Sequence, residues 1–137
     1  MKTVVKLARG VIVRNGNILL CHNLHDKHYF LPGGHVEKGE TPKQTLRREM
    51  LEELGLEPTS VELLLKFPNT YVKNGVTFVE EASIFLAKID SDEVVSKEDH
   101  IAFEWIPIKD LSTTNFKPSK SVGDIIKATN DNKKFWS

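Results

Sequence analysis

The chain has 137 residues, 39% of them hydrophobic, which suits one domain with its own core, so a single domain over residues 1–137 is expected. Its 19 basic and 19 acidic side chains give no net charge, which excludes the strong overall field that gathers nucleic acid or an anionic membrane. The single cysteine, Cys21, cannot form an internal disulfide, and charged residues interrupt residues 1–20 before any long apolar run develops. We therefore expect a soluble cytoplasmic protein. It is expected to be a monomer or homodimer and to have no membrane, DNA or RNA partner.

The N-terminal part predicts a β-hairpin followed by a sharp turn. Residues 4–13 are rich in β-branched side chains, and Asn15-Gly16 then precedes the apolar residues 18–20, which is the strongest short-range signal for a hairpin. Both arms are expected to be strands. After the polar residues 22–28, the backbone has to turn sharply at Pro32-Gly33-Gly34.

A helix is predicted over residues 42–54. Thr41 can cap its first turn, Pro42 suits the first helical position, and Gln44 completes a capping-box pattern. Gly55 can adopt the left-handed conformation that ends a helix. This element has both a start signal and a stop signal.

The rest of the chain predicts further strands and a second helix. Residues 61–67 and 76–89 read as strands, and Asn74-Gly75 between them indicates another tight turn. Residues 102–106 are a further strand candidate, and residues 119–128 carry apolar side chains at helical spacing. This order favours an α/β or α+β sandwich around one sheet.

The predicted helix over 42–54 carries an apolar stripe beside an acidic face. The stripe consists of side chains four positions apart, Leu46, Met50 and Leu54. Glu52 and Glu53 stand three and four positions after Glu49, so the three carboxylates lie within reach of one another. Many such clusters are only solvated faces. Here the cluster borders the core and follows a glycine turn, and hard divalent cations such as Mg²⁺ prefer oxygen ligands.

Residues 34–56 read GHVEKGETPKQTLRREMLEELGL, which resembles the Nudix box. The matching positions are Gly34, Glu40, Arg48, Glu49, Glu52, Glu53 and Gly55. Met50 stands where the family usually places a branched aliphatic residue, and methionine is adaptable enough to fill that core position. The preceding hairpin, Leu31-Pro32-Gly33 and residues 104–107 are also similar to the family. The resemblance implies an α/β fold, the Nudix α/β/α sandwich with a central mixed sheet.

The resemblance also implies a magnesium-dependent pyrophosphohydrolase, with Mn²⁺ as an alternative ion. Glu49, Glu52 and Glu53 would hold the metal, with the Gly33 carbonyl as an additional ligand. Arg48 would orient Glu49 or hold the loop through Glu40, although an ordinary surface ion pair is an equal alternative. Metal coordination would stabilise phosphate charge and acidify a water.

The general base stays open at this stage, because Nudix enzymes use either a helix glutamate, such as Glu49 or Glu53, or one from a later loop. Glu98, in the polar residues 96–100, is the loop candidate, although charged loops are often only solvated. Glu80 and Glu81 are adjacent on a predicted strand, so at most one can face the site. A surface position is the favoured interpretation for both.

Several other residues invite a binding role. His22, His25 and His28, with His35 nearby, suggest zinc, but the run looks like a loop without the rigid frame that zinc sites usually need. A more modest role for a histidine such as His35 is contact with substrate phosphate or ribose, and a surface histidine with no role is at least as common. Tyr71 resembles a base-stacking tyrosine of some dinucleoside-polyphosphate hydrolases, with partly buried packing as the alternative. Phe67, Phe78 and Phe103 are expected in the core, and Trp136 is expected to dock on the body or on a partner chain.

The expected substrate is a nucleotide with a diphosphate linkage: a nucleotide sugar such as ADP-ribose, a dinucleoside polyphosphate or a (deoxy)nucleoside triphosphate. Pro68 lies too early for the proline of many ADP-ribose hydrolases, which disfavours that substrate. The alternative from another class is a non-catalytic nucleotide sensor, but such domains commonly lose box glutamates, and all are present here. An isomerase or an RNA-decapping relative is disfavoured, because the first needs added ligands and the second usually has a basic surface.

Overall fold

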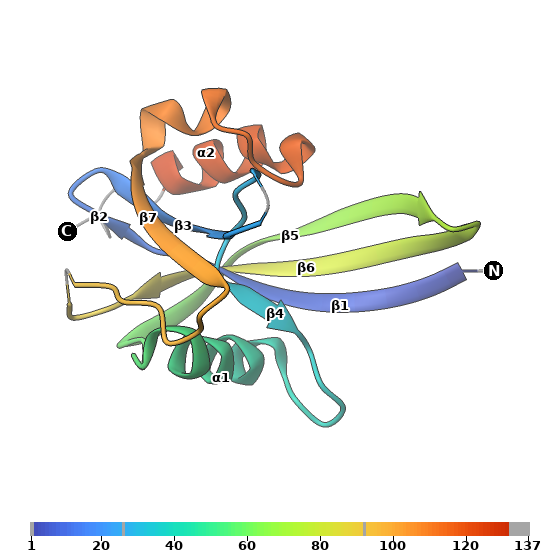
Figure 1. The fold of residues 1–137 in the computed structure, drawn as a ribbon, viewed down its shortest axis with the longest axis horizontal. Helices are drawn as coiled ribbons and strands as arrows, with labels where there is room; N and C mark the ends of the chain where they lie inside the picture. The colour runs from blue at the N-terminus through green and yellow to red at the C-terminus, as the bar shows by residue number, and fades with distance from the viewer. Residues whose placement is uncertain (1, 26, 92, 132–137) are drawn as a thin grey trace.

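A mixed four-stranded sheet forms one layer of the fold (Figure 1). The fold is that of a computed structural model, which describes residues 2–25, 27–91 and 93–131, so the prediction for Trp136 lies outside the described residues. The strands are β1 (Lys2–Val11), β4 (Gly33–His35), β5 (Ser60–Lys73) and β6 (Val76–Lys88). Their order is β4-β1-β6-β5; β1 and β6 are parallel and the other two pairs are antiparallel.

A second sheet, which the sequence did not indicate, has the order β2-β3-β7. It contains β2 (Val13–Arg14), β3 (Asn17–Asn23) and β7 (Ile101–Pro107), paired antiparallel. The predicted first hairpin is therefore only partly right. The turn at Asn15-Gly16 joins β2 to β3, but β1 leaves this hairpin and pairs with β6 and β4. Residues 4–13 thus belong to two sheets, which local periodicity cannot distinguish.

Helix α1 (Pro42–Leu54) has the predicted limits. The Thr41 hydroxyl accepts a hydrogen bond from the Gln44 backbone N–H, and the Gln44 side chain accepts one from the Thr41 N–H, so the capping box is complete. Gly55 ends the helix with φ 67°, a left-handed conformation that favours glycine. Local hydrogen bonds thus define both ends of the helix.

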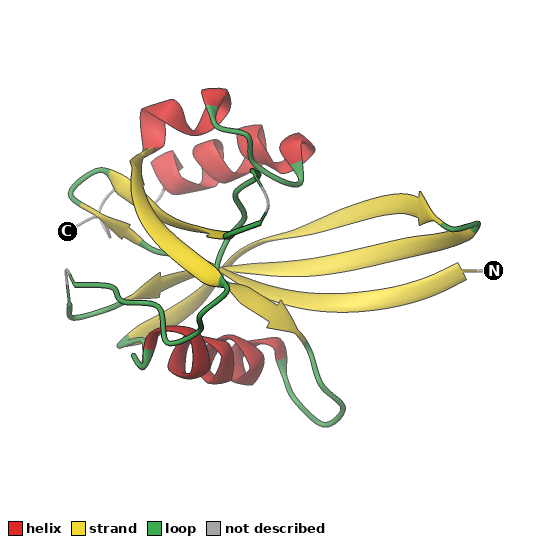
Figure 2. Cartoon of the chain, in the orientation of Figure 1, coloured by secondary structure: helices red, strands yellow, loops and turns green. Residues whose placement is uncertain are grey.

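The two helices cover opposite sides of the strands, as Figure 2 shows. Helix α1 packs on a core that includes Ala8, Leu46 and Met50. On the other side, the segment predicted as a second helix, residues 119–128, forms a 3-10 turn, η2 (Ser119–Ser121), followed by helix α2 (Val122–Asp131). With a further 3-10 turn, η1 (Ile108–Thr113), it covers a second core that includes Val11, Leu86 and Ile125. The predicted α/β sandwich with a central mixed sheet is confirmed. No helix among the described residues is long and apolar enough to cross a membrane.

Two of the three phenylalanines expected in the core are partly buried against it: Phe67 on the α2 side and Phe103 on the α1 side. Phe78 stacks instead on Tyr71, with 5.2 Å between the ring centroids. It lies near the start of β6, directly opposite Tyr71 of β5.

An ion pair ties the loop before α1 to the helix. Arg48 Nε lies 2.7 Å from Glu40 Oε2, and Arg48 Nη2 donates to Glu40 Oε1 at 3.1 Å, which makes the pair bidentate. Arg48 Nη2 also donates to the His35 carbonyl. The hydrogen bonds from Arg48 hold the pKa of Glu40 down at about 2. This geometry supports the loop-holding interpretation of Arg48 over an incidental surface contact.

The stripe on α1 generates a stability prediction. Leu46→Ala removes a side chain that is 0% exposed, and we expect it to lower the free energy of unfolding by roughly 2 to 5 kcal/mol, because it leaves a cavity under the sheet. Leu51→Ala, on the same helix and 53% exposed, is the matched control and should change stability by about 0.5 kcal/mol or less. Urea denaturation of both variants measures the difference; equal effects would contradict the packing of α1.

The Arg48–Glu40 pair predicts a pH dependence. Because folding lowers the pKa of Glu40 from its ordinary value of 4.5 to about 2, the pair stabilises the fold above about pH 4.5 and loses this effect as the pH falls through about 2. Glu40→Gln should therefore be less stable at pH 7 and lose less stability on acidification. Urea titrations between about pH 7 and 2 test this. Glu37→Gln, on an exposed carboxylate 3.7 Å from Arg48, is the control and should keep the wild-type slope.

Candidate active site

The C-terminal half of α1 packs directly against Gly33 and Gly34, the first two residues of β4. A Cβ atom on Gly34 would lie 2.5 Å from Glu49 Oε1, so only glycine lets this carboxylate approach the strand. Gly33 has φ 139°, and a Cβ there would collide with the Ala8 carbonyl oxygen. The two glycines thus allow α1, β4 and β1 to lie in close contact.

Glu49, Glu52 and Glu53 of α1 form an acidic cluster, and Arg48 contacts the first two of these three helix carboxylates. Its Nη1 donates to Glu49 Oε1 at 3.1 Å and lies 3.4 Å from both Glu52 carboxylate oxygens. The Glu49 side chain is 17% exposed, whereas Glu52 is 52% exposed. Glu49 therefore faces inward, and Glu52 lies at the open edge of the cluster.

Glu53 is a buried carboxyl group, with 5% exposure. Burial, and then the negative charge of Glu49, raise the pKa of Glu53 to about 8; the charge of Glu98 and a hydrogen bond with the Glu49 side chain act in the same direction, and Arg9 opposes them. Glu53 Oε1 has no hydrogen-bond partner. A buried carboxylate oxygen without a partner is costly unless a proton or a cation compensates it.

The loop that contains Glu98 docks on the end of α1. The Lys97 backbone N–H donates to the Glu53 carbonyl at 2.7 Å, and the His100 carbonyl accepts from the Leu24 N–H at 3.0 Å. Between these anchors, Glu98 lies close enough for its charge to act on Glu53, and its carboxylate is 3.3 Å from His100 Nε2. The structure thus brings the loop candidate to the helix carboxylates, 45 residues away in sequence.

The donor set fits a divalent cation. Glu49 and Glu53 contact each other, Glu98 stands near, and one buried oxygen of Glu53 has no protein partner. Over residues 2–25, 27–91 and 93–131, no three His, Cys, Asp or Glu side chains already converge as metal ligands, and Glu52 is turned to Arg48 instead. A bound ion would therefore have to draw Glu49 and Glu52 away from Arg48, a contest between two positive groups for the same carboxylates.

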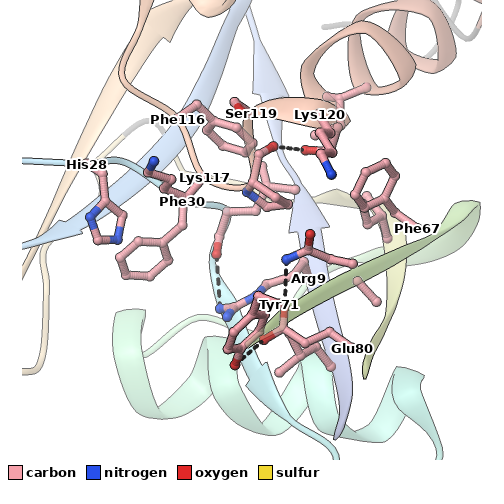
Figure 3. Close-up of a pocket in the computed structure, with 18 residues that line it drawn as sticks. Arg9, His28, Phe30, Phe67, Tyr71, Glu80, Phe116, Lys117, Ser119 and Lys120 are labelled. Carbon is pink, nitrogen blue, oxygen red and sulfur yellow. Dashed lines mark hydrogen bonds between the residues drawn. The ribbon is translucent and has the colours of Figure 1, made fainter. Parts of the chain in front are cut away.

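A cavity of about 480 Å³ lies beside the acidic cluster, between the mixed sheet and the segment that leads into α2 (Figure 3). Its walls combine aromatic rings with charged and polar groups; those labelled in the figure are Arg9, His28, Phe30, Phe67, Tyr71, Glu80, Phe116, Lys117, Ser119 and Lys120. The volume is in the range of small-molecule sites, and mostly apolar walls with a few polar groups are typical of them.

Arg9 links this cavity to the acidic cluster. It lines the cavity, yet its charge acts on Glu53 and Glu49 on one side and on Glu80 on the other. Its Nη1 donates to the Leu31 carbonyl at 3.3 Å, and its guanidinium carbon lies 5.6 Å from the Phe30 ring centroid. Burial lowers the pKa of Arg9, and the charges of Cys21 and of these carboxylates act in the opposite direction and raise it. A buried guanidinium between a ligand-sized cavity and carboxylates is suited to a phosphate group.

Sequence reasoning missed Arg9, although a signal was present. In β1, Leu7 and Val11 alternate toward one face of the sheet, and Arg9 occupies the position between them on that face. A charged residue on a strand face that is otherwise apolar indicates a functional position, and Arg9 is such a residue.

The polar wall of the cavity is formed by β5 and β6. Asn69 Nδ2 donates to Glu80 Oε1 at 3.3 Å, and the Tyr71 hydroxyl donates to Glu80 Oε2 at 3.4 Å. Glu80 thus lines the cavity, so the interpretation of it as a surface residue is wrong, whereas Glu81 is exposed, as expected. Only one of these two adjacent acids faces the cavity, as alternation along a strand predicts. Alternation does not indicate which side of the sheet carries a cavity.

The histidines are dispersed. His28 lines the cavity, and His22 packs edge-on against Tyr29, with its Nε2 4.0 Å from Glu104 Oε1. His35 is exposed on β4 and contributes its backbone carbonyl to Arg48. Among the described residues, no three of these side chains come together as metal ligands. His28, rather than the predicted His35, is the histidine placed at the cavity.

The sequence is similar to known families and proteins. The family model described as NUDIX domain matches residues 5–124. An 8-oxo-dGTP diphosphatase of Haemophilus influenzae is 30% identical over 126 residues, covering 88% of this chain and 88% of that protein. An RNA pyrophosphohydrolase of Psychrobacter cryohalolentis is 29% identical over 108 residues, covering 69% of this chain and 60% of that protein.

The fold is similar to solved structures of the same family. A MutT NUDIX hydrolase from Burkholderia pseudomallei has a TM-score of 0.74 and 28% identity, covering 89% of this chain and 97% of that one. A NUDIX hydrolase from Nitrosomonas europaea, 22% identical, shares the fold with a TM-score of 0.74 over 96% of this chain and 91% of that one. With the intact box on α1, these matches show that the chain belongs to the Nudix family of pyrophosphohydrolases, hydrolases that act on phosphoric anhydrides.

Proposed function

We propose that this Nudix protein hydrolyses nucleoside triphosphates, in a Mg²⁺-dependent reaction, to a nucleoside monophosphate and pyrophosphate. The observation that carries the proposal is the buried Glu53 carboxyl group, which lies against Glu49 and near Glu98 with one oxygen unpartnered. A structural carboxyl group at this depth would normally have its hydrogen bonds satisfied. This one is suited to a cation that arrives with the substrate.

The metal would be held by the three helix carboxylates, Glu49, Glu52 and Glu53, with the Gly33 carbonyl as a further oxygen donor. When bound, Mg²⁺ (or Mn²⁺) supplies positive charge to the phosphate oxygens and lowers the pKa of a coordinated water. Arg9 adds a fixed positive charge where the cavity meets the carboxylates. Arg48 keeps the loop before α1 in place through its two bonds to Glu40.

Glu98 is the proposed general base. Glu49 already accepts a hydrogen bond from Arg48 and shares one with Glu53, so its oxygens are largely occupied. Glu98 is 31% exposed, belongs to the loop between β6 and β7 and can be reached by water. Water oxygen attacks one phosphorus of the anhydride, the bond from that phosphorus to the leaving phosphate oxygen breaks, and Glu98 takes the proton released by the water.

The triphosphate class is favoured by the relative named 8-oxo-dGTP diphosphatase and by the cavity beside the cluster. A volume of about 480 Å³ can enclose a nucleobase between aromatic walls, while Arg9 marks the end nearest the carboxylates. The chain is also similar to RNA pyrophosphohydrolases, so RNA with a 5′-triphosphate belongs in the substrate panel. The sensor alternative predicts nucleotide binding without turnover.

Glu53→Gln tests the metal role. We expect turnover of nucleoside triphosphates with Mg²⁺ to fall by a factor on the order of 10² or more, because a buried ligand is lost, while the near-isosteric side chain preserves the fold. Pyrophosphate release measures turnover, and circular dichroism checks folding. Chelation of the metal should abolish wild-type activity. Glu57→Gln, an exposed acid just beyond α1, is the matched control and should retain full activity.

Wild-type protein that binds nucleotides but releases no pyrophosphate from any of them would support the sensor and overturn the enzyme assignment. Equal turnover by Glu53→Gln and wild type would remove Glu53 from the metal site and leave the hydrolase intact.

Glu98→Gln tests the base. Loss of a general base should lower kcat by roughly 10² to 10⁴-fold and abolish the acid limb of the pH–rate profile, since the group whose deprotonation permits proton transfer is gone. The profile of kcat measured across pH at saturating Mg²⁺ is the readout. Asp99→Asn, exposed in the same loop, is the control. An unchanged profile in Glu98→Gln would rule this residue out as the base.

A further inference from the structure

A charged residue of β6 lies in the cavity wall where its neighbours on the same face are apolar. Glu80 lines the cavity together with Ala82 and Ile84, the residues two and four positions later. Beyond them on the same face, Leu86 is part of the core. A carboxylate at the cavity end of such a series requires a ligand or a partner to explain it.

Two side chains of the adjacent strand hold this carboxylate in one orientation. Asn69 is paired directly with Glu80 across β5 and β6 and donates to Oε1, while the Tyr71 hydroxyl donates to Oε2. Each oxygen thus receives one donor from the protein. Since a carboxylate offers about four acceptor positions, one on each oxygen remains for a ligand.

The surroundings suit a flat ring with polar edges. Phe67, Tyr71 and Phe116 line the same cavity (Figure 3). The Tyr71 ring stacks on Phe78, with an interplanar angle of 15°. Arg9 lines the cavity together with Glu80, and its charge acts on Glu80 and on the acidic cluster. A nucleotide with its phosphates toward Arg9 and the cluster would therefore extend its base along the wall that carries Glu80.

We propose that Glu80 is the residue that selects the nucleobase, and that the base it accepts is a guanine-type purine. Guanine presents two adjacent donors, N1–H and the 2-amino group, which match the two free acceptor positions of the carboxylate. Adenine and cytosine place a ring acceptor beside their amino group, and uracil has one N–H between two carbonyls, so each would set an acceptor against a carboxylate oxygen. Hypoxanthine keeps N1–H but lacks the second donor.

This inference rests on the proposed function for its substrate class and adds the identity of the base. A site built to receive two donors discriminates strongly against a base that lacks one, because a buried acceptor is then left without its partner. The selection would therefore be visible between GTP and ITP, which differ only in the 2-amino group.

The test compares kcat/KM for GTP, ITP, ATP and CTP in wild type and Glu80→Gln, with Mg²⁺. We expect wild type to favour GTP over ITP by about tenfold or more, and Glu80→Gln to bring that ratio close to one, since the amide offers one acceptor and one donor. Turnover of ITP by the variant shows that it is folded. Glu81→Gln, exposed and adjacent on the same strand, is the matched control and should keep the wild-type ratio.

A second measurement does not depend on catalysis. Calorimetric titration of the metal-free protein with GMP and with IMP should show tighter binding of GMP to wild type, and no difference for Glu80→Gln. If no triphosphate is hydrolysed, the proposed function fails while this titration still decides the base. A GTP to ITP ratio near one in wild type, or an unchanged ratio in Glu80→Gln, would overturn the role of Glu80.

Discussion

The burial of the Glu53 carboxyl group is the constraint around which the rest of the site is arranged. An ionised carboxylate removed from water is unfavourable unless a proton, a hydrogen-bond donor or a cation compensates it, and here the nearest groups include two more carboxylates, Glu49 and Glu98. Gly33 and Gly34 let β4 lie close to β1 and to Glu49. A protein that maintains this arrangement without a donor for Glu53 Oε1 keeps a position ready for a positive ligand.

Helix α1 serves the core and the site at once. Leu46 and Met50 pack on the sheet, and the adjoining face carries the box glutamates, so the packing of the apolar stripe sets where the carboxylates point. Arg48 joins these two roles, because the same guanidinium holds the loop through Glu40 and orients Glu49. The packed helix fixes the backbone of the site, whereas the Glu49 and Glu52 side chains would have to leave Arg48 when a cation binds.

The elements predicted best are those defined by local interactions. The limits of α1 depend on hydrogen bonds between residues three positions apart and on a glycine that can adopt positive φ, all within 15 residues of sequence. The first hairpin was predicted less well. Asn15-Gly16 does make the turn, but whether β1 continues into that hairpin or joins β6 is decided by contacts with residues 77–86, about 70 positions later.

By itself, the sequence determined the helix with its acidic face, most of the strand segments and the resemblance to the family, because these depend on spacing along one segment. Only the tertiary structure decided that Glu98 lies near Glu53, that Arg9 lies between the acidic cluster and the cavity, and that Glu80 faces this cavity while Glu81 does not. The physical reason is that alternation in a strand assigns residues to two faces but does not say what covers each face. The helix packed on each side of the sheet settles that, and it comes from elsewhere in the chain.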